Sequence, residues 1–246
     1  MALYPTAMRS DAAAQLVEPC WSGLLAELAV HERNAIHRAS QVRLYAAGDV
    51  LMSANAPSRV AIFPITALVA VGRPLRDGRR IAAGLVGNEG VLGMDIILDT
   101  SDQLDEAVVQ CPGTVYCMPA DDLRHHFDAT GRLQRSILRF AHAFLGQVAQ
   151  NTACARFHDV RPRLAKWLLM IDERAGKLET GRSTSLLAAA LGAEEREIEK
   201  AIEQLAAAGA VRHRNGTITI GREALEPWAC ECYETVRFDR ADDGAQ

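Results

Sequence analysis

The spacing of hydrophobic residues divides the chain into a helical start, a strand-rich middle and a helical end. Over residues 1–40, apolar positions fall at helical spacing on one face: Leu16, Leu24, Leu25, Leu28 and Ile36. From about Val42 to Met118, short apolar runs alternate with turn sequences such as Asp77-Gly78. Many short strands separated by turns are typical of a barrel or jelly roll, so we expect a β-roll domain over residues 41–132.

A single long helix is predicted after the strands, from about Leu133 to Arg156. One stripe along it is apolar and consists of Leu133, Ile137, Phe140, Phe144 and Val148. This stripe could pack inside the chain, or it could pair with a second copy as in a parallel coiled coil. We favour a homodimer, because two-fold dimers are the commonest assemblies, and assign residues 133–158 to a dimerisation helix and hinge.

The segment from Ser183 to Ile220 has the order of a winged helix-turn-helix. Ser183, Thr184 and Ser185 offer side-chain oxygens at the start of a first helix, and Gly192 can form the turn that ends it. A second helix then carries an apolar stripe, and a hairpin closes the motif at Asn215-Gly216. We therefore predict a winged helix domain over residues 159–236, followed by a flexible tail at 237–246.

The second helix of this motif is acidic, although the second helix of a helix-turn-helix is the one that enters the major groove of DNA. Five glutamates outnumber Arg196 and Lys200 there, and the whole chain has a net charge of -4. An acidic helix repels phosphates, so we expect double-stranded DNA to bind more weakly than in a typical protein of this kind. The predicted DNA contacts are Ser183, Thr184, Ser185, Arg196, Lys200, Arg212 and Arg214. The alternative is that the acidic helix docks a protein partner instead of DNA.

The cysteines and histidines do not predict a metal site. Cys230 and Cys232 are the only close cysteine pair, and the sequence supplies no second pair to complete a zinc site. Cys154 and His158 lie four apart on a helix, and we interpret them as a buried small residue beside a hinge histidine rather than as a reactive thiolate pair. We expect no metal, no cofactor and no catalytic activity.

Nothing in the sequence predicts export or membrane insertion. The first residues lack a signal-peptide pattern, and the longest apolar run, Ala61 to Gly72, is interrupted by Pro64. We therefore expect a cytoplasmic protein that does not associate with membranes.

The complete order resembles the Crp/Fnr family of bacterial transcription regulators over nearly the whole chain. The residues that carry the resemblance are 44–50 (LYAAGDV), 84–93 (GLVGNEGVLG), 147–154 (QVAQNTAC), 163–170 (RLAKWLLM) and the winged helix-turn-helix. The resemblance implies an α+β chain with a jelly-roll-like sensor domain, a long dimerisation helix and a C-terminal winged helix that binds promoters. It also implies a small-molecule effector, whose identity the sequence does not disclose, and makes RNA polymerase a candidate partner.

The sensor domain departs from the members of that family that bind cyclic AMP. Those members resemble one another in a Gly-Glu pair and a later Arg-Ser or Arg-Thr pair that holds the cyclic phosphate. The first pair corresponds here to Gly87-Asn88 or Asn88-Glu89, and the second falls at Asp105-Glu106. Two carboxylates repel a phosphate, so cyclic AMP is not the expected ligand. We assign the effector pocket to Gly87, Asn88, Glu89, Gly90, Asp105 and Glu106. A third hypothesis keeps the β-roll as a small-molecule binding module with a vestigial output domain.

Overall fold

The computed structural model describes residues 23–100, 103, 105–129, 131–175, 183–214 and 217–237. The chain divides into two compact units, residues 1–145 and 146–246, and the division falls inside the predicted long helix. The predictions for residues 1–22, for the turn at Asn215-Gly216 and for the tail from 238 lie outside the described residues.

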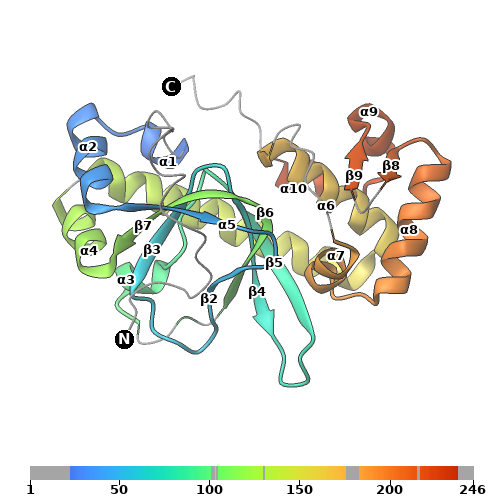
Figure 1. Ribbon diagram of the computed structural model, residues 1–246, viewed down its shortest axis with the longest axis horizontal. Coiled ribbons are helices and arrows are strands. Elements are labelled where there is room, and N and C mark those ends of the chain that lie inside the picture. Colours follow the sequence, from blue (N-terminus) through green and yellow to red (C-terminus); the bar gives the residue numbers. More distant parts are fainter. Residues whose placement is uncertain are drawn as a thin grey trace. The chain divides into compact units, whose positions relative to one another are not determined.

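The first unit is built on two antiparallel sheets that form the predicted β-roll (Figure 1). One sheet has the order β1-β7-β3, and the other has the order β2-β6-β4-β5. The strands are β1 Gln41–Tyr45, β2 Val50–Met52, β3 Val60–Pro64, β4 Leu68–Pro74, β5 Arg80–Val86, β6 Glu106–Cys111 and β7 Gly113–Pro119. Strands that are neighbours in space are often distant in sequence, and this places residues from β4, β5 and β6 side by side.

Helices cover the three-stranded sheet and contribute to its core. They are α1 Gly23–Ala26, α2 Val30–Ala39, α3 Met94–Leu98, α4 Ala120–Ala129 and, up to residue 145, the long helix α5 Gly131–Phe157. Helices α2 and α4 contact β7, and the strands and helices enclose a core that includes Leu25, Ile36, Phe63 and Leu123. A second apolar cluster lies between the two sheets and includes Val69, Val109 and Val115. No described helix combines the length and the apolar character needed to cross a bilayer.

The apolar stripe of α5 packs largely against its own chain, which corrects the predicted dimer contact. Leu133 and Ile137 are 0% exposed and belong to the core of the first unit. Phe140 and Phe144 stack with ring centroids 5.8 Å apart and pack against the roll, while Val148 is half-buried. This packing is the alternative in which the stripe lies inside its own chain. Because Leu133 and Ile137 are buried in that core, a second copy cannot contact them.

The second unit contains a helical core and a small hairpin. Its elements are α6 Val160–Ala175, α7 Thr184–Leu191, α8 Glu195–Ala207, β8 Val211–Arg214, β9 Thr217–Ile220, α9 Arg222–Leu225, the 3-10 helix η2 Glu226–Trp228 and α10 Cys232–Val236. Helix α6 buries a continuous run of residues from 164 to 171, and α8 buries Ile198, Ile202 and Leu205, which is the predicted stripe.

Hydrogen bonds fasten the last helices of this unit to α6. The Arg222 guanidinium donates to the Glu173 carboxylate (Nη2 to Oε1, 2.8 Å) and to the Tyr233 hydroxyl (2.7 Å). Tyr233 in turn donates its hydroxyl proton to the same carboxylate of Glu173. Burial is the main cause that raises the pKa of Tyr233, so its hydroxyl remains a donor at neutral pH. The segment that contains α10 is therefore held against α6 by a polar network as well as by apolar contacts.

Candidate nucleic-acid interface

Helices α7 and α8 form the helix-turn-helix that the sequence predicts. Helix α7 ends at Gly192, which has a φ of 59° in the left-handed region that favours glycine. The Ala193 N–H donates to the Ala188 carbonyl oxygen (3.0 Å), so the turn is closed before α8 begins after Glu194. Ser183 stands at the N-cap of α7, but its hydroxyl pairs with that of Ser185 (2.6 Å) and makes no capping bond. Both serines are exposed and Thr184 is half-exposed.

Part of the acidity of α8 has a local structural cause. The Glu197 carboxylate accepts a hydrogen bond from the Glu194 backbone N–H (Oε2, 2.9 Å), as in a capping box. Glu195 and Glu197 also lie in the first turn, where a negative charge stabilises the positive end of the helix dipole. The Glu194 carboxylate forms an ion pair with Arg196 (Oε2 to Nε, 2.6 Å). Glu194, Glu195 and Glu197 therefore have a structural role at the start of α8.

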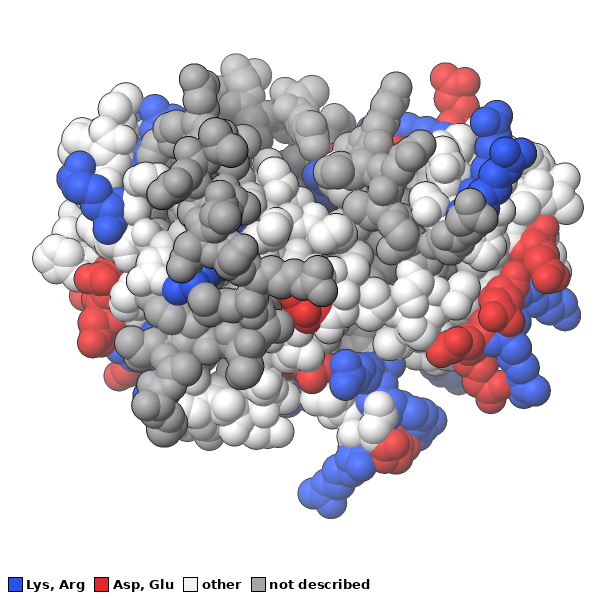
Figure 2. All heavy atoms as spheres, in the orientation of Figure 1, with Lys and Arg blue, Asp and Glu red and all other residues white. Residues whose placement is uncertain are grey.

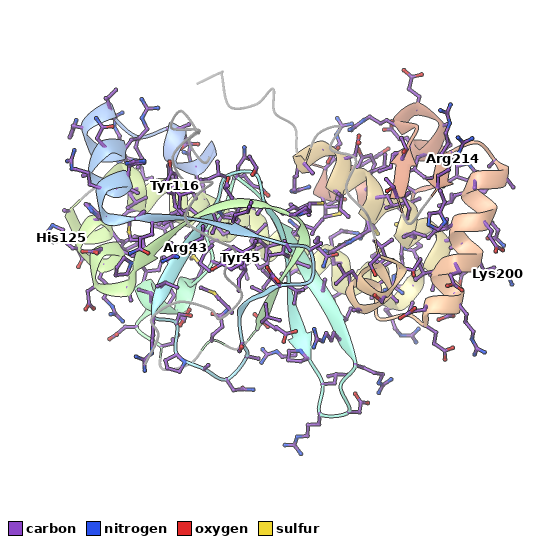
Figure 3. All side chains as sticks on the ribbon, in the orientation of Figure 1. Arg43, Tyr45, Tyr116, His125, Lys200 and Arg214 are labelled. Carbon is purple, nitrogen blue, oxygen red and sulfur yellow. The ribbon has the colours of Figure 1, made fainter. Side chains whose placement is uncertain are left out.

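The outer face of α8 nevertheless presents its two basic residues. At 100° per residue, Arg196 and Lys200 lie one turn apart and on the side opposite the buried Ile198 and Ile202. All charged residues of α8 are exposed, and Figure 2 shows basic and acidic side chains interleaved along this helix. Lys200 projects outward from α8 (Figure 3). Glu203, one turn after Lys200, lies beside this basic pair.

The hairpin after α8 adds a second basic element. Strands β8 and β9 pair with Arg212 opposite Thr219 and Arg214 opposite Thr217. Side chains two residues apart share a face of a strand, so Arg212 and Arg214 lie on the same side of the hairpin, and both are exposed. Figure 3 labels Arg214 on β8. The buried Val211 anchors the hairpin to the unit. This arrangement provides two cations that a nucleic-acid backbone approaching the wing would meet.

Several known proteins that this chain is similar to are transcription regulators. No protein-family model matches the chain. A CRP-like cAMP-activated global transcriptional regulator of Mycobacterium tuberculosis is 24% identical over 180 residues, which cover 70% of this chain and 80% of that protein. FixK2 from Bradyrhizobium japonicum has a TM-score of 0.66 at 17% identity, covering 78% of this chain and 98% of that one. A CRP/FNR-family regulator from Thermus thermophilus has a TM-score of 0.62 at 20% identity, covering 77% of this chain and 98% of that one.

The chain has the fold of the Crp/Fnr regulators. The resemblance predicted from the sequence is thereby confirmed, and so is the combination of a β-roll with a C-terminal helix-turn-helix.

In this Crp/Fnr fold, the residues predicted to form the effector pocket lie at two separate places. The Gly87–Gly90 segment is a turn after β5, closed by a bond from the Gly90 N–H to the Gly87 carbonyl oxygen (3.1 Å). The Glu89 carboxylate accepts from the Gly87 N–H (3.2 Å), and the Asn88 carbonyl oxygen accepts from the Leu24 N–H (3.0 Å). These bonds stabilise the turn and join it to α1.

The two carboxylates at the start of β6 lie at the other end of the sheet. Glu106 of β6 pairs with Gly72 of β4, which in turn pairs with Ala82 of β5. The turn at Gly87 follows Val86, which is four residues beyond Ala82 along β5. Four residues of strand span about 13 Å, so the structure does not bring the two parts of the predicted pocket together.

Each of these two carboxylates forms an ion pair with an arginine. Asp105 pairs with Arg73 of β4 (Oδ1 to Nε, 3.3 Å), and Glu106 pairs with Arg80 of β5 (Oε2 to Nη1, 3.1 Å). Sequence reasoning missed both arginines, because the pairing depends on the order of the strands. Together the four groups carry no net charge, so they supply no excess positive charge for a phosphate.

The structure also brings together two pairs of residues that the sequence did not connect, Cys154 with His158 and Cys230 with Cys232. Cys154, His158, Cys230 and Cys232 place their sulfur and nitrogen atoms within 4.8 Å of one another, all in the second unit. The Cys154 and Cys230 sulfurs are 3.5 Å apart. A hydrogen bond from the Cys230 thiol is the main cause that lowers the pKa of Cys154 to about 4, and the same bond raises the pKa of Cys230. A hydrogen bond to Cys154 raises the pKa of His158. The available signals were the four-residue spacing of Cys154 and His158 and the Cys-x-Cys pair.

Proposed function

We propose that this protein is a homodimeric DNA-binding transcription regulator of the Crp/Fnr type. The observation that carries the proposal is the outward position of Arg196 and Lys200 on α8, together with Arg212 and Arg214 on one face of the wing. A helix and a hairpin that expose cations in this way are suited to the major groove and to the flanking phosphates. Similarity to a CRP-like regulator along 70% of the chain supports this role.

The roles of the basic residues follow from their chemistry. Arg196 has the planar fork that reads guanine, and Lys200 is a point charge suited to a phosphate. Releasing Arg196 from its exposed ion pair with Glu194 costs about 0.2–1 kcal/mol, which one good base contact exceeds. Ser183, Thr184 and Ser185 at the start of α7, with Arg212 and Arg214, are backbone contacts in this proposal.

Glutamates beside the cations weaken the interaction without abolishing it. Glu199 and Glu203 are exposed on the same side of α8 as Lys200, so they repel phosphates that Lys200 attracts. The proposed protein therefore binds DNA with a lower affinity than it would have with neutral residues at these two positions. It depends on the wing and on dimerisation for the remainder of its affinity, because two linked half-sites bind more tightly than one.

The proposed dimer seam on α5 keeps Val148 of the predicted stripe and replaces its buried residues with neighbouring positions that are exposed or half-buried. Positions at alternating intervals of three and four residues remain exposed or half-buried along the helix: Leu138, Ala141, Leu145, Val148, Thr152 and Ala155. This spacing is the a/d pattern of a two-stranded coiled coil. Leu138 is 56% exposed and Leu145 is 67% exposed, and pairing of two copies would bury both.

The proposed effector is a small molecule other than cyclic AMP. Arg73 and Arg80 are engaged by Asp105 and Glu106, so the strand ends where the phosphate-binding pair would lie are electrically neutral. A regulator of this kind has no catalytic role, works in the cytoplasm where the promoters are, and acts on RNA polymerase. The cAMP-activated relative would then share the fold and differ in its ligand.

A second function is favoured by the acidic surface of α8. Five glutamates from Glu194 to Glu203 are exposed on or beside this helix, and such a surface is complementary to a basic protein partner. In that case the winged helix would be a protein-docking module and DNA binding would be absent.

The test is fluorescence anisotropy of the purified full chain with pooled genomic duplex fragments over a salt series. Binding that falls steeply with salt supports the DNA-binding role. Lys200→Ala should then reduce the slope of log K against log salt by about 1, the value expected for one phosphate contact. Arg38→Ala is the matched control, because Arg38 is an exposed cation on α2 of the first unit.

Two further outcomes separate the alternatives. Glu199→Gln with Glu203→Gln should raise DNA affinity about tenfold, since removing each charge relieves about 0.7 kcal/mol of repulsion at 6 Å in water. No binding at low salt by a folded dimer, with the neutralised variant equally inactive, would favour the protein-docking function.

A further inference from the structure

Four side chains with metal-ligating atoms meet in the second unit. Three are thiols, from Cys154, Cys230 and Cys232, and the fourth is the imidazole of His158. The three cysteines are buried and His158 is partly exposed. We propose that these four residues bind one Zn²⁺ ion in a closed tetrahedral site. The proposal does not depend on whether the winged helix binds DNA.

Helix geometry supplies one pair of ligands, and a tight turn supplies the other. Cys154 and His158 lie four residues apart at the end of α5, and the His158 N–H donates to the Cys154 carbonyl oxygen (3.1 Å), which continues the helical turn. Side chains four apart lie on one face of a helix. Cys230 and Cys232 are joined by a turn in which the Tyr233 N–H donates to the Cys230 carbonyl oxygen (2.9 Å). Both pairs are therefore placed by local backbone bonds.

The distances between the donor atoms fit a single ion. With Zn–S bonds of about 2.3 Å, two sulfurs of a tetrahedral site are about 3.8 Å apart. The Cys154 and Cys230 sulfurs are 3.5 Å apart, and the Cys232 sulfur is 3.6 Å from Nδ1 of His158. All four donor atoms lie within 4.8 Å of one another, so small side-chain rotations complete the tetrahedron. An iron–sulfur cluster with two or more irons needs its cysteines further apart than this.

The surrounding residues orient the ligands as they do around known zinc ions. Nε2 of His158 lies 3.2 Å from Oε1 of Glu231, which leaves Nδ1 to face the Cys232 sulfur. A carboxylate on the far ring nitrogen is the usual partner of a zinc-bound histidine. The Gln150 amide donates to the Cys232 sulfur (2.9 Å), as donors do to metal-bound thiolates.

A buried cation balances the charge that such a site would carry. Three thiolates and one Zn²⁺ sum to a charge of -1. Lys166 is 3% exposed, donates to the Asn151 side-chain oxygen (Nζ to Oδ1, 2.6 Å) and interacts with the Cys154 sulfur. A buried ammonium requires a negative partner, because burying an isolated charge is costly. The metal–thiolate centre would be that partner.

Zn²⁺ is the ion that this donor set selects. Cysteine-rich tetrahedral sites with one histidine prefer zinc, and four protein ligands leave no open position for catalysis. The ion would join the end of α5 to the segment before and within α10, residues 76 positions apart in sequence. The winged helix lies between them along the chain, so the metal would stabilise the whole second unit.

The first experiment measures metal in the full-length protein. The protein is produced without a histidine tag in zinc-supplemented, reducing medium, dialysed, and examined by elemental analysis. We expect one Zn²⁺ per chain, with the content of Cys230→Ala and Cys232→Ala falling close to zero. Cys111→Ala is the matched control, because Cys111 is an equally buried cysteine in β6 of the first unit, and this variant should keep its zinc.

The second experiment keeps the proposal testable if the variants fail to fold. The wild-type protein is stripped with a chelator under reducing conditions and titrated with Co²⁺, which reports its own geometry. Intense visible bands with thiolate charge transfer in the near ultraviolet, saturating at one Co²⁺ per chain and lost on adding Zn²⁺, are the expected result. A metal-free protein with a weak, octahedral Co²⁺ spectrum would overturn the proposal. So would an iron–sulfur absorption spectrum, or a Cys154–Cys230 disulfide in protein isolated under reducing conditions.

Discussion

The exposed leucines of α5 allow a direct test of the proposed dimer. In an isolated chain, Leu138 is 56% exposed and Leu145 is 67% exposed, whereas the neighbouring Ile137 is fully buried. Burying a whole leucine side chain contributes about 1.5–3 kcal/mol, so burying the exposed two-thirds of Leu145 contributes about 1–2 kcal/mol. The residue occurs once in each copy, and the dimer gains about 2–4 kcal/mol from this position, or about 30- to 1,000-fold in Kd.

Leu145→Glu should therefore weaken the dimer by at least this factor, because it also brings two carboxylates together in the seam. Sedimentation equilibrium over a range of protein concentrations gives the dimer dissociation constant directly. Leu98→Glu is the control, since Leu98 is 64% exposed on α3 and outside α5. If Leu145→Glu and Leu138→Glu both leave the dissociation constant unchanged, the seam is not the interface and the reasoning from helical spacing is refuted.

Three further predictions concern the first unit. Ile137→Ala should lower the free energy of unfolding by about 2–5 kcal/mol, because it leaves a cavity in the core. Leu138→Ala, on the same helix but exposed, should change the stability of the monomer by less than about 0.5 kcal/mol. Denaturant titration of dilute protein measures both values. Gly90→Ala should destabilise by about 1–3 kcal/mol, because its added methyl group would overlap the Phe140 ring, and a normal melting temperature would contradict this packing. Cyclic AMP should leave the melting temperature unchanged. A ligand that binds the folded protein and is present at 100 times its Kd would instead add about 2.7 kcal/mol to the free energy of unfolding. A clear upward shift with cyclic AMP would disprove the electrostatic argument made from Asp105 and Glu106.

The elements of this protein were largely predictable, because they depend on short-range rules. Alternating apolar runs and turns indicated the β-roll, and helical spacing indicated α5 and the buried face of α8. Gly192 was predicted as the turn between α7 and α8, where only a residue that tolerates a positive φ fits easily. Each of these features depends on the spacing of apolar and turn residues that are near neighbours in the sequence. Ser183 is the N-cap residue of α7, but its hydroxyl pairs with the Ser185 hydroxyl and makes no bond to a backbone N–H of the helix.

The partners of these elements were decided by the tertiary structure. An apolar stripe indicates that one face of a helix is buried, but it does not indicate what covers that face. Leu133 and Ile137 were therefore predicted to contact a second copy, whereas their own chain buries them. The ion pairs of Asp105 and Glu106 depend on a strand order that does not follow the sequence. The cysteine–histidine cluster unites residues 76 positions apart. Local patterns in this sequence determine which elements form, because backbone hydrogen bonds and side-chain periodicity act between near neighbours. Contacts between distant residues arise only when the whole chain packs, and in this protein those contacts decide the charge, the exposed surface and the ligand sets.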